Sequence, residues 1–196
     1  MNQENFSPQE SLQVIESMIK KVKTSYHDTG VGPILWGCVV TICSIVSYFA
    51  QLHKHPQWFA IWLLTLVAVI PQIVISVRER KQKKYVTHND VISGAVWTTF
   101  GFSMMVISMI ENLGKLNIHS SVYMLIYGIP TIITGWVCKV KSMIIGGILC
   151  WLFSISSVFV DYPYPFLFMA ASAIAAWLIP GLLLNYKYRK LKAANV

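Results

Sequence analysis

The side chains of this sequence that could bind a metal or transfer a proton include its five histidines and eight acids, while its four cysteines lie inside apolar stretches without Cys-x-x-Cys spacing. Two groups could form at opposite edges of the apolar stretches: His53, His55, His119, Glu111 and Asp161 at one edge, and His27, Asp28, His88 and Asp90 at the other. A metal site needs three or four ligands that converge at about 2 Å, and the spacing shows no such set. Loop histidines and helix-capping aspartates are the favoured interpretation, so neither a metal nor a cofactor is predicted.

Catalytic motifs are also missing from the sequence. It contains no G-x-S-x-G, Walker A, H-E-x-x-H or paired-carboxylate motif. The middles of the apolar stretches carry no charged residue or histidine, and such groups mark proton relays and ion paths in membranes. Gln72 is the one deep amide, and we expect it to form a hydrogen bond between helices. The sequence therefore predicts a protein that is not an enzyme.

The elements that must position these residues are long apolar stretches. Hydrophobic residues make up 55% of the 196 residues and charged residues 12%, whereas a soluble domain has about 25% charged residues. A bilayer core of about 30 Å needs about 20 apolar residues in a helix. Six stretches qualify, at roughly 31–52, 57–77, 91–112, 120–138, 142–160 and 166–186. The predicted fold is an all-α polytopic transmembrane bundle of six helices, spanning residues 31–186.

The basic residues predict the orientation of this bundle. Fourteen of the 16 lie before the first span, in the second and fourth connections, or in the tail at 187–196. These segments all share one side if there are six spans, and basic connections face the cytoplasm. Both termini are therefore expected inside, in a bacterial inner membrane. We expect no nucleic-acid partner, and anionic lipid headgroups are expected to bind Arg78, Arg80, Lys81, Lys83, Lys84, Lys187, Arg189 and Lys190.

The segment before the first span, residues 1–30, contains a predicted amphipathic helix at 7–27. Ser7 is a suitable N-cap, and Glu10 completes a capping box. Apolar residues then recur with helical spacing. A helix lying on the membrane surface is the favoured interpretation. A docking face for a cytoplasmic protein, or a plug for the inner mouth of the bundle, stays open.

The spans show signs of an internal repeat. Each even-numbered span contains an Ile-Pro pair, and a serine in the preceding span lies 24, 22 or 23 residues before that proline. This regularity predicts a two-helix unit copied three times in one orientation. The three hairpins are residues 31–77, 91–138 and 142–186.

A proline inside a helix leaves a backbone carbonyl without its hydrogen-bond donor. If the three helices bend together, the freed carbonyls could line an inward-facing cavity. The alternative is that proline is simply common in membrane helices. The residues of this candidate cavity are Pro71, Gln72, Tyr127, Pro130, Thr131, Trp177 and Pro180.

Small residues predict where helices approach closely. The sixth span has small residues four positions apart, as in Ser172 and Ala176, and is expected to be the most buried. Gly94 and Gly101 place a similar groove on one face of the third span.

Most aromatic residues apart from Tyr127 and Trp177, with Trp36 and Trp97 included, are expected in belts at the membrane interfaces.

Three segments carry a resemblance to known proteins: Ser7 to Leu12, Leu35 to Gly37, and Ile179 to Asn185. They resemble segments of small bacterial inner-membrane proteins, and this resemblance implies no activity. The three-hairpin plan is also similar to that of mitochondrial carriers. The carrier signature, however, places its prolines on odd-numbered helices and follows them with an acidic residue. Here the prolines lie on even-numbered helices without one, so the sequence is not assigned to that family.

Three functions follow as hypotheses. The leading one is a non-catalytic accessory, sensory or regulatory membrane protein that uses its cytoplasmic face. The alternative is a small carrier or channel for an uncharged or amphipathic solute, through a proline-kinked bundle. A lipid-modifying enzyme is disfavoured, because no catalytic group is visible. The sequence predicts no ligand and no oligomeric state.

Overall fold

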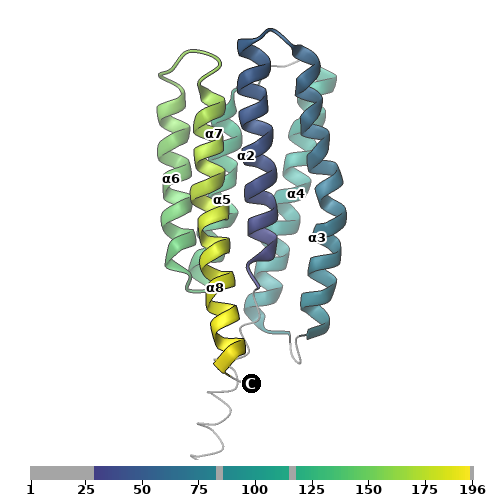
Figure 1. Ribbon diagram of the computed structural model, residues 1–196, viewed down its shortest axis with the longest axis vertical. Coiled ribbons are helices and arrows are strands. Elements are labelled where there is room, and N and C mark those ends of the chain that lie inside the picture. The colour runs from purple at the N-terminus through teal and green to yellow at the C-terminus, as the bar shows by residue number, and fades with distance from the viewer. Residues whose placement is uncertain (1–28, 83–85, 115–117, 195–196) are drawn as a thin grey trace, which may run out of the picture.

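A computed structural model describes residues 29–82, 86–114 and 118–194 of the chain. The predicted helix at 7–27, together with Lys83 and Lys84, lies outside these described residues. Within them the protein is all-helical and has no strand. The predicted all-α class is therefore confirmed, and Figure 1 shows the helices running alternately up and down.

Six helices form the bundle, and two of them combine different helix types. A 3₁₀ turn, η1, leads into α3, and a π-helical turn, η2, joins α7 to α8. The elements are α2 (Val31–Leu52), η1 (Pro56–Trp62), α3 (Leu63–Gln82), α4 (His88–Gly114), α5 (Ser120–Val137), α6 (Lys141–Ser157), α7 (Pro165–Ala173), η2 (Ile174–Leu178) and α8 (Ile179–Ala194).

Five helices are long and apolar enough to cross a membrane, which indicates an integral membrane protein. The exception is α6, whose 17 residues span about 26 Å. The sequence predicted a longer span at 142–160. The α-helix ends earlier because Val158 and Phe159 donate to carbonyls only three residues back, which tightens the last turn. Asp161 and the prolines Pro163 and Pro165 then favour a turn.

Two helix ends are closed by lysines in the left-handed backbone conformation. Lys54 has φ 55° after α2, and Lys139 has φ 57° after α5. At each, the following amide donates to a carbonyl five residues back, His55 to Ala50 and Val140 to Gly135, both at 2.8 Å. This pattern is the Schellman motif, which stops a helix and reverses the chain.

The core of the bundle consists of α2, α5, α6 and the α7–η2–α8 helix. The most extensive contact is between α5 and α6, and α2 packs along α7 and η2. Its fully buried residues are mainly small, such as Cys43 and Ser44 on α2 and Ser172 and Ala176 on α7 and η2. Small residues permit this close approach in lipid, as the sequence predicted for the sixth span. The α5–α6 pair joins two of the proposed hairpins, and the internal repeat stays a prediction.

The two remaining helices, α3 and α4, are peripheral. α3 packs on α2, whereas α4 packs on α5. Ala68 is the one buried residue in the described part of α3, and α4 has none. These two helices therefore expose most of their apolar side chains to the surrounding lipid.

Candidate functional site

The π-helical turn η2 ends at Leu178, two residues before Pro180. The amide of Ile179 donates to the carbonyl of Ile174, five residues back, instead of the usual four. Pro180 has no amide hydrogen and would crowd the carbonyl four residues earlier, that of Ala176. The wider turn relieves this crowding. Such turns occur frequently at functional sites, so the surroundings of η2 define the candidate site.

Two glycines from the core hold η2 in place. A Cβ on Gly37 of α2 would lie 2.7 Å from the amide nitrogen of Leu178, and one on Gly146 of α6 would lie 2.4 Å from the carbonyl oxygen of Ala175. Both distances are shorter than real Cβ contacts. The backbone of η2 therefore sits directly against α2 and α6, and its position is fixed.

Trp177 on η2 is the centre of the site and is 2% exposed. Its indole nitrogen donates to the hydroxyl oxygen of Thr131 on α5 at 2.9 Å, and that hydroxyl donates to the carbonyl of Tyr127 at 2.8 Å. The rings of Trp177 and Tyr127 lie 4.9 Å apart. The structure thus brings together three residues that the sequence placed in one candidate cavity.

Two aromatic residues of α4 complete the cluster around Trp177. The rings of Trp97 and Phe100 each lie 6.1 Å from that of Trp177, and Phe100 lies 6.0 Å from Tyr127. These are edge-to-face contacts, a favoured geometry for aromatic pairs. The sequence placed Trp97 in an interfacial belt and did not single out Phe100. The spacing of Trp97, Phe100 and Met104 was the signal, because it puts all three on one helix face.

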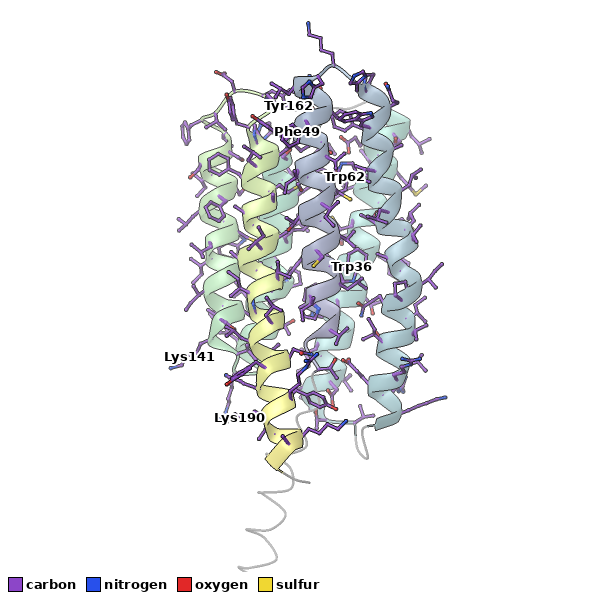
Figure 2. All side chains as sticks on the ribbon, in the orientation of Figure 1. Trp36, Phe49, Trp62, Lys141, Tyr162 and Lys190 are labelled. Carbon is purple, nitrogen blue, oxygen red and sulfur yellow. The ribbon has the colours of Figure 1, made fainter. Side chains whose placement is uncertain are left out.

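A second set of hydrogen bonds joins η1 and α3 to α2, with one further bond inside α3. The indole nitrogen of Trp36 donates to Oε1 of Gln72 at 3.1 Å, and Nε2 of Gln72 donates to Ser76 at 3.1 Å. The indole of Trp62 donates to Ser47 at 2.8 Å. The predicted bond of Gln72 between helices is confirmed, and Figure 2 labels Trp36 and Trp62 beside α2 and α3.

The three repeated prolines have different surroundings. Pro71 is exposed on α3, whereas Pro130 and Pro180 are buried in the core. Only Pro180 follows a π-helical turn; Pro71 and Pro130 lie within α-helices. The structure therefore does not bring the three together, because α3, which carries Pro71, contacts only α2 and η1 among the described elements.

Two of the candidate metal ligands, Asp90 and His119, cap helices, whereas His27 and Asp28 lie outside the described residues. Asp90 accepts from the backbone amide of Thr87 at 2.9 Å, and Thr87 accepts from the amide of Asp90 at 3.2 Å. This is a capping box at the start of α4, so the predicted helix-capping role of Asp90 is confirmed. The ring of His119 accepts from the amide of Ser121 at 3.2 Å. No group of three possible metal ligands occurs in the described ranges.

One end of the bundle, which we term the basic end, carries exposed cations. It contains the end of α3, the start of α4, the α5–α6 turn and the end of α8, and Figure 2 labels Lys141 and Lys190 there. Lys54 lies at the opposite end. The basic side chains described there are Arg78, Arg80, Lys81, Lys139, Lys141, Lys187, Arg189, Lys190 and Lys192, all exposed.

The fold and these two regions define an all-helical integral membrane protein with an aromatic interior and a cationic end. Comparison with known protein families, characterised protein sequences and solved structures gives no match. The function must therefore be argued from the chemistry of the two regions. Aromatic rings can hold an apolar group by packing, and exposed lysines and arginines attract anions.

Proposed function

We propose that this chain is a non-catalytic protein of the bacterial inner membrane, with both termini in the cytoplasm. It acts there as an accessory, sensory or regulatory partner of other membrane or cytoplasmic components. The observation that carries the proposal is the basic end, where cations from α3, from the α5–α6 turn and from α8 are gathered and exposed.

The positions of these cations support a cytoplasmic binding face. The basic residues of membrane proteins concentrate on the cytoplasmic side, and the anionic lipids of that leaflet attract them by about 1 kcal/mol each. The cations of α3, of the α5–α6 turn and of α8 lie at the same end of the bundle, so together they can contact a broad anionic surface. An acidic surface of a cytoplasmic protein, or the anionic leaflet itself, fits this end.

The packing of the interior supports a role without transport. Trp177, Tyr127 and Thr131 are buried and hydrogen-bonded or stacked in the middle of the bundle. A solute passing between α5 and η2 would have to displace all three side chains. Interiors packed in this way resist such displacement.

The alternative, a small carrier or channel, has support from one feature. The π-helical turn η2 and Pro180 form a local irregularity at the most buried point of a membrane helix, and broken helices mark binding sites in transporters. Trp177 would then act as a gate. Flux of an amphipathic solute from proteoliposomes, faster in Trp177→Ala than in the unaltered protein, would favour this alternative.

The leading proposal is tested by crosslinking in cells followed by purification in mild detergent. We expect the full chain to retain an acidic partner protein or anionic lipid. A variant with Lys187, Arg189 and Lys190 changed to Gln should lose most of it, and deletion of residues 1–27 should weaken it further. Lys54→Gln, at the opposite end, is the matched control and should retain it. Equal retention by all four proteins would contradict the proposal.

A further inference from the structure

The last part of α8 extends past the ends of the neighbouring helices. A Cβ added to Gly30, the residue directly before α2, would lie 2.4 Å from the carbonyl oxygen of Gly181 and 2.9 Å from the amide nitrogen of Asn185. The start of α2 is therefore level with this turn of α8. From Asn185 the helix continues for nine residues, to Ala194, a length of about 14 Å. We call residues 186–194 the projecting end, and no glycine or proline interrupts the helix there.

The basic residues of α3 and of the α5–α6 turn lie near the level at which α2 begins. Glu79, among the cations of α3, accepts a hydrogen bond from the hydroxyl of Thr29. On α6, Gly146 packs against η2, and the helix begins five residues earlier, at Lys141. Figure 1 shows α8 running past the ends of the other helices, and Figure 2 shows Lys190 below Lys141. The basic end therefore has two levels, and the projecting end forms the outer one.

The outer level lies beyond the headgroup layer of a bilayer. Leu182 and Leu183 are exposed apolar residues, and they form the last turn of α8 that suits contact with lipid. Lys190 follows Leu183 by seven residues, about 10 Å along the helix, whereas the headgroup layer of one leaflet is about 5–8 Å thick. In the proposed orientation, this part of α8 therefore extends into the cytoplasm.

The projecting end has two different faces. Gly181, Leu184 and Tyr188 follow one another at intervals of three and four residues and share the face toward the bundle. The first two are buried, and Tyr188 is partly buried. Tyr186 and Lys190 are four residues apart on another face, and both are exposed. The outward face thus presents an aromatic ring next to a cation.

The charge of the projecting end is entirely positive. Its exposed basic residues are Lys187, Arg189, Lys190 and Lys192, and residues 186–194 contain no acid. The acids described at this end of the bundle are Glu79 and Asp90, which accept hydrogen bonds from Thr29 and Thr87. A second copy of the described bundle would bring the same cations to the same level. A complementary partner must therefore be acidic and different from this bundle.

We propose that the projecting end of α8 binds an acidic segment of a cytoplasmic protein. Arg189 and Lys190 pair with carboxylates of that segment, and Tyr186 packs on its apolar part. Cations nearer the membrane, such as Arg80 and Lys141, contact the lipid headgroups instead. This inference rests on the proposed function, since it requires the basic end to be cytoplasmic, and it adds the class of partner. Anionic headgroups fit the outer level less well, because it lies beyond their layer.

The test compares two matched variants of the full-length protein, each of which loses one arginine and one lysine. One carries Arg189→Gln with Lys190→Gln, and the other carries Arg80→Gln with Lys141→Gln. The protein is held in phosphatidylcholine nanodiscs, and binding of a short fluorescent polyglutamate peptide is measured by anisotropy. We expect the first variant to bind the peptide about fivefold more weakly, the effect of two surface ion pairs. The second should change this affinity by less than about twofold.

A second measurement tests the lipid level. Each protein is extracted from vesicles containing equal amounts of phosphatidylglycerol and phosphatidylcholine, and native mass spectrometry measures the retained lipid. The variant at Arg80 and Lys141 should lose more phosphatidylglycerol than the variant at Arg189 and Lys190. If the latter loses this lipid and keeps the peptide, the leaflet is the occupant and the inference is wrong.

Three further outcomes would overturn the inference. The first is an equal loss of peptide affinity in the two variants. The second is tighter peptide binding after deletion of residues 1–27, because the chain's own acidic residues would then cover the projecting end. The third is an unaltered protein that retains phosphatidylglycerol but does not bind the peptide. An unaltered protein that binds neither would contradict the proposed function as well.

Discussion

The core and the peripheral pair of helices use the same residue type for opposite purposes. Gly37 and Gly146 in the core each face a neighbouring backbone too close for any side chain, whereas Gly94 and Gly101 on α4 face open space. The core glycines permit contact between helices in lipid, where close packing replaces the hydrophobic effect as the source of stability. The α4 glycines have no protein atom packed against them. Glycine in a membrane helix therefore indicates room, and only the neighbours decide whether that room is filled.

The largest effect is expected from truncating the centre of the core. Trp177→Ala removes a buried ring and the donor to Thr131. Leaving such a cavity in the core lowers the free energy of unfolding by about 3–5 kcal/mol. Unfolding in detergent should show this loss. Trp136→Ala is the matched control, because Trp136 is 68% exposed, and it should change stability by less than about 0.5 kcal/mol. Equal losses of stability in the two variants would contradict the assignment of Trp177 to the core and of Trp136 to the surface.

A methyl group on a glycine should separate the two regions next. Gly146→Ala forces a Cβ against the carbonyl of Ala175, and overpacking of this kind costs about 1–3 kcal/mol. Gly94→Ala adds the same methyl group in open space and should be neutral, or stabilising by up to about 1 kcal/mol through helix propensity. The midpoint of unfolding in matched detergent measures both. A loss at Gly94 as large as that at Gly146 would show that the α4 face is packed.

The smallest effect is expected where α3 joins the core. Gln72→Leu removes the acceptor for Trp36 and the donor to Ser76, and hydrogen bonds between membrane helices contribute about 0.6 kcal/mol on average. Gln72→Glu keeps an acceptor for the indole of Trp36 and serves as the comparison. It is measured at a pH low enough to protonate the new carboxyl group, so that no charge is introduced. A loss in Gln72→Leu above about 2 kcal/mol would mean that α3 belongs to the core.

Much of the helical layout could be predicted because it depends on local properties. The break after α2 follows from His53 to Pro56, and the α5–α6 turn from Lys139 to Lys141, where charge and turn formers interrupt apolar runs. Asp90 could be predicted as a helix cap from its position alone. The length of α6 was overestimated, because hydropathy continues through Val158 to Val160 after the α-helix has ended.

The candidate site could be predicted only in part. Tyr127, Thr131 and Trp177 were grouped from their depth near prolines, and they do meet. Pro71 was grouped with them by the same reasoning and lies exposed on a peripheral helix. A matched position along two helices gives depth in the membrane, but it does not give the direction in which each helix faces. Trp97 and Phe100 were missed as partners of Trp177 for that reason.

The sequence by itself determined the helical class, the apolar lengths, the ends of most helices and the gathering of cations in particular connections. Each of these depends on residues near one another in the chain. The tertiary structure decided that η2 widens into a π turn between Gly37 and Gly146, that Trp177 donates to Thr131, and that α3 and α4 stay apart. These depend on how the surfaces of different helices fit, and in lipid that fit is set by shape and hydrogen bonding between segments distant in the chain.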